Sequence, residues 1–480
     1  MDGTDIEPTK IKKILVVRTD AIGDLLLATP ALAALRAKFP QAHIALMVRP
    51  YNQFVVKNNP SLDELIVEDL YDRFHFGRRI GLWKYLQWIF RLRAKKFDVM
   101  INLAGDFPYA LIGYLAGIPC RIGDRGRVAY SWLYNCQVNQ RLNSWALHEV
   151  EHNFELLAPL GIDLRSAGQC RLYPDADKLE AAAQLLRDNG LAGKKLIGVN
   201  VGTSGTNKPW ALANYAELVK RLAAAYGTKI VLVGGPKENE LNKKILPELS
   251  GTAINLGGLP VELFIALLKQ LNLYIANDTG PTHLAAALGV PEVILYTSKY
   301  QQPARWAPWG NRHKLIKNVS NCPFPCRPPS CLMDLCTAEI TIEEVLTAAD
   351  VLLAGGGKMT PAEEKLDRER ISFNILAAGD GPRKASAVNL LNQNGWRVWE
   401  LSTEELGRIS VRSLLELFIR YEINIVHSFV RYSWKLRLAT LLTSVKMVFP
   451  AMLIRDEGKN FADLAALVKY YEDKFNRRLI

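Results

Sequence analysis

The first residues whose types and spacing suggest chemistry follow a short apolar run near the N-terminus. Residues 14–17 (Ile-Leu-Val-Val) read as a strand, and Arg18 and then Gly23-Asp24 follow it at the start of a leucine-rich helix. A carboxylate there faces the carboxyl edge of a parallel sheet and can accept a proton from a hydroxyl, which is general-base chemistry. The alternative is that Asp24 caps the helix by accepting a backbone N–H bond, and the local sequence alone favours this cap.

Two later loops contain residue types that bind phosphate. Residues 202–210 follow a strand and precede a helix; their small side chains let the backbone approach an anion, and Lys208 supplies a positive charge. Residues 277–283 (Asn-Asp-Thr-Gly-Pro-Thr-His) lead into an alanine-rich helix, whose free N–H groups and positive dipole end suit a pyrophosphate. The alternatives are a flexible polar loop in the first case and a capped turn without a ligand in the second.

Two patterns suggest metal binding. Residues 148–152 match H-E-x-x-H, the zinc protease pattern, but no convincing third ligand follows, so we do not favour a protease. Cys322, Cys326, Cys331 and Cys336 lie within fifteen residues in a proline-rich loop and could hold a structural zinc ion. Free thiols fit this cluster equally well, and disulfide or redox pairing remains a third alternative.

A basic, aromatic segment spans residues 73–96. It contains Arg78, Arg79 and six other Lys or Arg residues but no acid, and Trp83, Trp88 and other aromatic residues are interleaved. An amphipathic helix of this kind suits an anionic membrane surface or a phosphorylated lipid. The alternative is an ordinary helix with its aromatic side chains in the core.

The elements that position these residues alternate between short β-branched runs and longer amphipathic segments, which predicts an α/β fold with parallel sheets. We expect a first Rossmann-like domain over residues 1–180, a second over 190–355 facing it across a cleft, a linker over 356–370 and an extra α/β domain over 371–480. The expected strands are residues 14–17, 43–48, 64–68, 98–103, 195–201, 229–234, 273–277 and 293–296, and then 372–377, 397–401, 424–427 and 447–455.

Composition narrows the possible classes. The chain has 480 residues, 49% of them apolar, and a formal net charge of +12, which favours an anionic partner. It has no signal peptide pattern and no run of 18 apolar residues, so we expect a cytoplasmic protein that is soluble or peripheral on the inner membrane. A nucleic-acid-binding protein would also use the positive charge, but no nucleic-acid motif is present.

Residues 18–24 with Thr29-Pro30, together with residues 277–283 and 285–291, resemble the motifs of glycosyltransferase family 9, which includes the lipopolysaccharide-core heptosyltransferases. The resemblance covers about residues 12–353 and implies a GT-B fold. It implies that Asp24 is the catalytic base, which reverses the preference for a cap. It also implies that Lys208 and the loop Asp278, Thr279 and Gly280 hold the donor diphosphate. We add Thr203 and, as a contact of the ribose, Glu238 to the expected donor site; His283 either contacts phosphate or sugar there or is an ordinary helix-terminal histidine. The expected acceptor and membrane side consists of Arg18, Arg78, Arg79 and His148.

By this resemblance the chain is a metal-independent, inverting glycosyltransferase. We expect it to move a sugar, with heptose from ADP-heptose as the leading choice, onto a lipopolysaccharide-core or similar glycolipid without a cofactor. The alternatives are a family 9 transferase with a different donor or acceptor, and a non-catalytic relative that binds a glycan or nucleotide. The role of residues 371–480 stays open.

Overall fold

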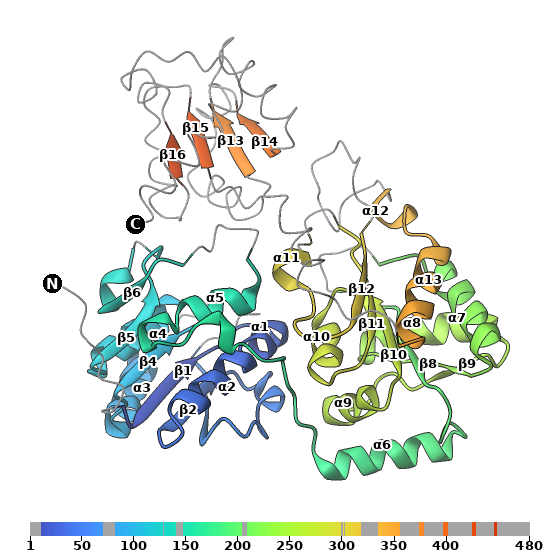
Figure 1. Cartoon of the computed structure of the whole chain (residues 1–480), viewed down its shortest axis with the longest axis horizontal. Helices are drawn as coiled ribbons and strands as arrows, with labels where there is room; N and C mark the ends of the chain where they lie inside the picture. The colour runs from blue at the N-terminus through green and yellow to red at the C-terminus, as the bar shows by residue number, and fades with distance from the viewer. Residues whose placement is uncertain are drawn as a thin grey trace.

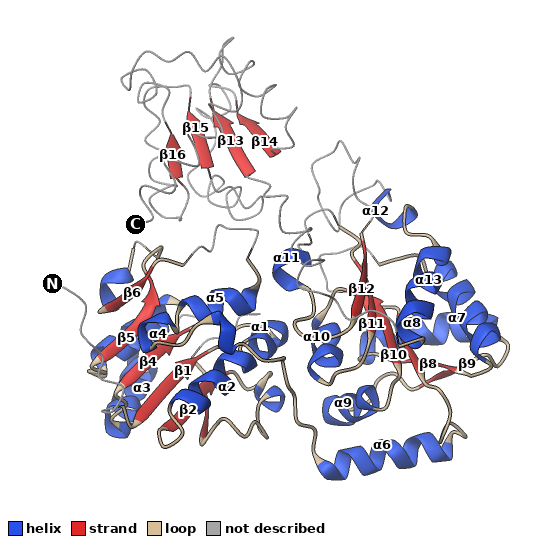
Figure 2. Ribbon diagram, in the orientation of Figure 1, coloured by secondary structure: helices blue, strands red, loops and turns tan. Residues whose placement is uncertain are grey.

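The computed structural model describes residues 11–70, 82–127, 129–140, 147–203, 209–298, 301, 303–317 and 335–355, and four strands beyond residue 370. Its strands form two six-stranded parallel sheets and a separate four-stranded parallel sheet (Figures 1 and 2). The α/β class expected from the alternating sequence pattern is therefore confirmed.

The first domain is built on a sheet with the order β3-β2-β1-β4-β5-β6. Alternate residues of β1 point to opposite faces of this sheet: Ile14 and Val16 pack with helices α1, α2 and α5, whereas Leu15 and Val17 pack with α3 and α4. The sheet is therefore buried on both faces, as parallel sheets require. Its elements are β1 (Lys13–Val17), α1 (Ile22–Leu27), α2 (Thr29–Lys38), β2 (His43–Val48), β3 (Glu64–Val67), α3 (Leu82–Lys95), β4 (Val99–Asn102), α4 (Phe107–Leu115), β5 (Cys120–Asp124), β6 (Cys136–Val138) and α5 (Glu149–Glu155).

The second domain is also built on a six-stranded parallel sheet, with the strand order β12-β11-β10-β7-β8-β9. Helices α7 and α13 cover one face of the sheet, and α9 and α10 cover the other. Helix α6 (Ala176–Asp188) lies between the two sheets in the sequence and packs along α9 (Figure 1). The other elements are β7 (Ile197–Asn200), α7 (Leu212–Tyr226), β8 (Ile230–Leu232), α8 (Pro236–Ile245), β9 (Ala253–Asn255), α9 (Val261–Lys269), β10 (Leu273–Asn277), α10 (Gly280–Ala287), β11 (Glu292–Leu295), α11 (Pro303–Trp306), β12 (His313–Ile316), α12 (Leu335–Ala338) and α13 (Ile342–Leu353).

The third sheet consists of the four strands beyond residue 370. They are β13 (Asn374–Ala378), β14 (Arg397–Leu401), β15 (Ile425–Ser428) and β16 (Lys446–Val448), and they are arranged in the order β14-β13-β15-β16. Each of these strands was expected from the sequence, although the last is described only as far as Val448.

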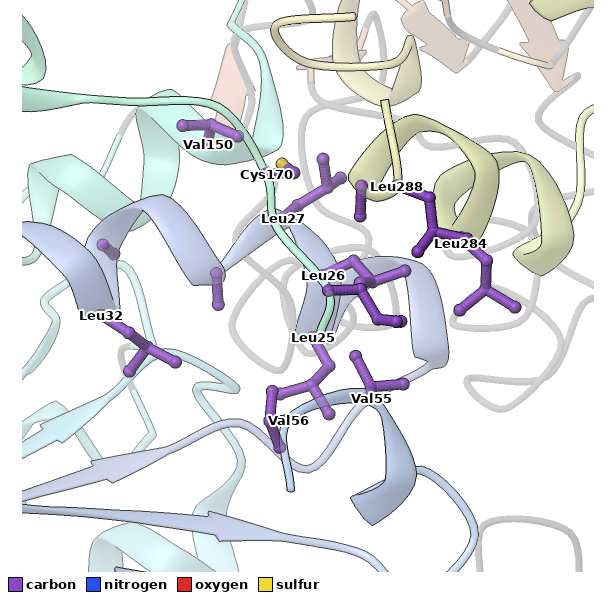
Figure 3. Packing of buried hydrophobic residues seen from close by; sticks show 14 of the residues in the cluster. Leu25, Leu26, Leu27, Leu32, Val55, Val56, Val150, Cys170, Leu284 and Leu288 are labelled. Atoms are coloured by element: carbon purple, nitrogen blue, oxygen red, sulfur yellow. The ribbon is translucent and has the colours of Figure 1, made fainter. Parts of the chain in front are cut away.

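The first and second domains share an apolar cluster. Leu25 and Leu26 of α1 belong to the same buried cluster as Leu284 and Leu288, which lie on α10 and directly after it (Figure 3). The backbone N–H of Leu172 also donates a hydrogen bond to the carbonyl of Ala287. Helices α1 and α10, which carry the sequence motifs, are therefore packed against each other.

Candidate active site

Asp24 is the third residue of α1, and its side chain is 19% exposed. The N-cap of this helix is Ala21, which has extended backbone angles and makes no side-chain capping bond. The helix-cap interpretation of Asp24 is therefore wrong. Its Oδ1 instead accepts a hydrogen bond of 3.1 Å from Nη2 of Arg18.

Arg18 follows β1 and is only 2% exposed. Its Nη1 donates to the carbonyl of Leu103 at 2.8 Å and to Oδ1 of Asn153 at 3.1 Å, and its Nη2 also donates to Oε1 of Glu149 at 2.8 Å. Burial lowers the pKa of Arg18, but the neighbouring carboxylates outweigh this and raise it above its usual value. Arg18, expected on the acceptor side, is thus a buried permanent charge that is hydrogen-bonded to Asp24.

Glu149, at the start of α5, binds a second arginine from the other domain. Arg305 of α11 donates from Nε and Nη2 to Oε2 of Glu149 at 3.1 and 3.0 Å. Burial raises the pKa of Glu149, but Arg18 and Arg305 outweigh it and lower the pKa to about 2. Glu149 is therefore ionised, and one continuous chain of charges joins Asp24, Arg18, Glu149 and Arg305.

This depressed pKa predicts an acid-dependent loss of stability. The pKa of Glu149 is 4.5 in the unfolded chain and about 2 in the folded protein. Its contribution to the free energy of unfolding is therefore present above about pH 4.5 and is lost as the pH falls towards 2. The shift corresponds to about 3 kcal/mol of this free energy. Between pH 5 and 3 we expect the free energy of unfolding of Glu149→Gln, measured in urea, to fall less steeply with acid than that of the wild type. Glu343→Gln, at an exposed ion pair with Arg221 that solvent screens, should change the slope much less than Glu149→Gln does; equal slopes for all three proteins would contradict the assignment.

His148 is the N-cap of α5 and is 3% exposed. Its Nδ1 accepts a hydrogen bond from the N–H of Val150 at 3.2 Å, so Nε2 carries the proton and donates to the carbonyl of Ala307 at 2.8 Å. Both ring nitrogens are thus engaged within the protein, which excludes His148 as the zinc ligand of an H-E-x-x-H site. Across the described ranges, no group of three His, Cys, Asp or Glu residues is placed to hold a metal.

In the second domain, Asp278 follows β10, and its Oδ2 accepts a hydrogen bond from Nε2 of Gln301 at 3.1 Å. Burial raises the pKa of Asp278, whereas His283, Gln301 and Lys317 oppose the rise. Thr279 is the N-cap of α10, and Gly280 is its first residue.

His283 of α10 is 8% exposed and packs directly on the helix that carries Asp24. A Cβ atom added at Gly23 would lie 2.7 Å from Cδ2 of His283, closer than such atoms approach. Burial lowers the pKa of His283, although Asp278 opposes this shift. The absence of a side chain at Gly23 therefore allows α1 and α10 to meet.

Thr203 and Glu238 lie near the carboxyl ends of β7 and β8. The Oγ1 atom of Thr203 is buried and has no hydrogen-bond partner. The side chain of Glu238 packs over Gly202 and Gly234, where an added Cβ atom would overlap it. An unpaired hydroxyl beside a carboxylate leaves polar groups available to a ligand.

Several expected residues lie outside the described residues, namely Lys208, Arg78, Arg79, Cys322, Cys326 and Cys331. Cys336 lies on α12, but its side chain is not described. Conversely, the sequence analysis missed Asn153 and Arg305, which belong to no motif. It read Glu149 only as the acid of the zinc pattern, although that acid binds the arginine that orients Asp24.

Comparisons with known proteins show the family to which the chain belongs. Residues 86–336 match the model of "Glycosyltransferase family 9 (heptosyltransferase)". Lipopolysaccharide heptosyltransferase 2 of Salmonella typhimurium is 32% identical over 295 residues, which are 59% of this chain and 82% of that protein. Among solved structures, a family 9 glycosyltransferase from Veillonella parvula superposes on this chain with a TM-score of 0.63 at 22% sequence identity. The superposition covers 74% of this chain and 100% of the Veillonella chain.

A second solved structure is the ADP-heptose lipopolysaccharide heptosyltransferase II of Escherichia coli. It superposes with a TM-score of 0.57 at 25% identity, over 72% of this chain and 99% of its own. The similarity thus spans 82% of the Salmonella protein and nearly the whole of both solved structures, and it leaves at least a quarter of this chain unmatched.

Proposed function

This chain belongs to glycosyltransferase family 9 and is a GT-B glycosyltransferase, and we propose that it moves a heptose from ADP-heptose onto a lipopolysaccharide-core or similar glycolipid. The names of its relatives support this choice of donor and acceptor, since two of them are lipopolysaccharide heptosyltransferases. The observation that carries the proposal is the position of Asp24, held by Arg18 on a helix that packs against α10.

In the proposed reaction, Asp24 accepts the proton of the acceptor hydroxyl while the oxygen of that hydroxyl attacks the anomeric carbon of the donor sugar. The bond from that carbon to the donor diphosphate breaks on the opposite face, so one new glycosidic bond forms with inversion and ADP leaves. Negative charge grows on the departing phosphate. The N-terminus of α10 and Lys208 would stabilise this charge, which is the work that a metal performs in other transferases.

The donor is proposed to lie over the carboxyl ends of β7, β8 and β10. Thr203 offers an unpaired hydroxyl there, and the Asp278–Gly280 turn opens α10. Glu238, which packs over Gly202, is the candidate partner for the ribose hydroxyls. Each of these groups is at the edge of the sheet where parallel α/β folds bind ligands.

Thermal shift measurements test the donor. ADP is expected to raise the melting temperature more than GDP, UDP or CMP, because a ligand that binds only the folded state stabilises it. A larger shift with another nucleotide would overturn the heptose assignment while keeping the transferase. No shift with any of the four would favour a non-catalytic relative instead.

Thr203→Val removes the unpaired hydroxyl with little change of shape. Losing one hydrogen bond to ADP should raise its Kd about three- to tenfold, measured by calorimetry. Thr228→Val is the matched control, because Thr228 precedes β8 at the opposite edge of the same sheet and bonds to the carbonyl of Lys195. Equal ADP affinities for the wild type and Thr203→Val would exclude Thr203 from the donor site.

We also propose that the outer surface of α3, α4 and residues 131–133 docks on an anionic membrane. Most of the exposed large apolar side chains in the described chain lie here: Trp83, Phe90, Phe107, Tyr114, Leu115 and Trp132. The rings of Tyr114 and Trp132 are 5.6 Å apart, and the guanidinium of Arg121 lies over Tyr114. Within residues 82–127 and 129–140, every exposed charged side chain is basic. This mixture of aromatic and basic groups suits the headgroup region.

No helix among the described residues combines the length and the apolar character needed to cross a bilayer. Attachment of the protein to a membrane is proposed to occur through the surface of α3, α4 and residues 131–133. Trp83 and Trp132, 72% and 61% exposed, are its most prominent side chains.

Replacing both Trp83 and Trp132 by alanine should lower binding to vesicles of anionic lipid about tenfold or more, because each indole would bury apolar area on docking. Cosedimentation measures this binding. Tyr173→Ala removes an exposed aromatic side chain outside this surface and serves as the control. Binding that is the same for wild type and double variant would rule out this docking surface.

A further inference from the structure

The charge chain at the base begins in the first domain and ends in the second. Asp24, Arg18 and Glu149 belong to the first domain, and Arg305 belongs to the second. We propose that Arg305 and Glu149 form an interdomain latch that orients Asp24 when the two domains close. This inference rests on the proposed sugar transfer, because it assigns Arg305 and Glu149 as positioning residues for that reaction.

The argument starts from the division of hydrogen bonds at Glu149. Its Oε1 accepts from Arg18 at 2.8 Å, and its Oε2 accepts both bonds from Arg305, at 3.0 and 3.1 Å. Both bonds from Arg305 end on one oxygen, and each is a charge-assisted hydrogen bond, which is stronger than a bond between neutral groups. The side chain of Glu149 is 6% exposed and that of Arg305 24%, so solvent screens this pair weakly.

The same nitrogen of Arg18 serves two carboxylates. Nη2 donates to Oε1 of Glu149 at 2.8 Å and to Oδ1 of Asp24 at 3.1 Å, so the two acids compete for it. Arg305 neutralises part of the charge on Glu149 and thereby weakens the pull of Glu149 on Arg18. When Arg305 is withdrawn, Glu149 draws Nη2 towards itself, and Asp24 loses the contact that fixes its orientation.

Neighbouring contacts show that Arg305 is placed by the interdomain interface and not by chance. The carbonyl of Ala307, two residues later, accepts a hydrogen bond from Nε2 of His148, which precedes Glu149. The ring of Trp309 lies 4.9 Å from that of His148. Residues 305–309 therefore contact the start of α5 at three points. One of these contacts, the ion pair between Arg305 and Glu149, is linked to Asp24 through Arg18.

The test compares Arg305→Ala and Arg305→Lys with Arg221→Ala, which removes an exposed ion pair within the second domain. Energy transfer between dyes on the two domains reports closure without any assumption about the substrate. With ADP bound, Arg305→Ala should shift the population towards longer distances, Arg305→Lys should recover part of the loss, and Arg221→Ala should match the wild type.

Kinetics with ADP-heptose supply the second readout. Arg305→Ala should lower kcat about ten- to hundredfold while the KM for the donor changes less than threefold, because the loss lies in the orientation of Asp24 and not in donor contacts. In a protein that already carries Glu149→Gln, adding Arg305→Ala should lower kcat little further. Unchanged distances together with unchanged kcat would overturn the latch, as would equal effects of Arg305→Ala on both backgrounds.

The experiments distinguish failure of the proposed donor from failure of the proposed latch. If the wild type does not turn over ADP-heptose, the proposed donor is wrong, and the interdomain distances alone then decide the latch. If the wild type turns over and Arg305→Ala keeps both its closed population and its kcat, the transferase stands and the latch is wrong.

Discussion

Asp24→Asn is expected to lower kcat for sugar transfer about 10³-fold, because general-base catalysis by a positioned side chain contributes about 10²–10⁴-fold. Asparagine keeps the size of the side chain and an oxygen that can accept the hydrogen bond from Arg18. It cannot take up the proton of the acceptor hydroxyl. Initial rates at saturating donor and acceptor measure the effect, and ADP affinity and melting temperature should stay near the wild-type values.

The matched control for this variant is Asp20→Asn. Asp20 lies 3.4 Å from Nε of Arg18, so its removal also takes one negative charge from the same arginine. A loss confined to Asp24→Asn identifies a proton acceptor, whereas an equal loss in both variants would point to a purely electrostatic role. Wild-type kcat in Asp24→Asn would remove Asp24 from the mechanism.

Gly23→Ala is expected to lower kcat about 10²-fold, which is the cost of displacing a catalytic group by about 1 Å. Within a helix, alanine is favoured over glycine by roughly 0.5–1 kcal/mol, so α1 itself should not be weakened. The new methyl group would instead meet the ring of His283 and push the two helices apart. Activity should therefore fall without a loss of secondary structure, as measured by kinetics and circular dichroism.

Two further variants isolate the cause of this effect. On a His283→Ala background the obstructing ring is gone, so adding Gly23→Ala should change kcat less than threefold, whatever role His283 itself has. Gly168→Ala is the control, because a Cβ atom there meets nothing within 4 Å. A full loss of activity from Gly23→Ala on the His283→Ala background would show that the contact between α1 and α10 is not responsible.

The sequence predicted the strands that carry the site because local patterns determine them. The runs at residues 43–48 and 273–277 were expected with the bounds that the structure shows. Four strands were missed. The edge strands β6, β9 and β12 have only three or four residues, too few to display a period of two. The inner strand β5 has five residues, but its sequence Cys-Arg-Ile-Gly-Asp is not a β-branched run. The fold class followed from the repetition of strand and helix and did not need these four strands.

The site was predictable only where its residues fall in one continuous motif. Asp24 lies in the first turn of a helix that follows a strand, and Asp278 lies between a strand and a helix, which is visible in the sequence. The partners of Arg18, which binds Asp24, are distant in the chain: Asn153 and Glu149 lie 135 and 131 residues beyond Arg18, and Arg305 lies 156 residues beyond Glu149. The sequence does not reveal such pairs, because only the packing of α1, α5 and α11 brings them together.

The apolar cluster shared by the two domains makes closure depend on temperature. Separating α1 from α10 would expose Leu25, Leu26, Leu284 and Leu288 to water (Figure 3). Exposure of apolar surface raises the heat capacity, and the association of such surfaces weakens on cooling. Opening should therefore carry a positive heat-capacity change, so that the population of closed molecules falls in the cold and the Arrhenius plot of a closure-limited rate curves downward at low temperature.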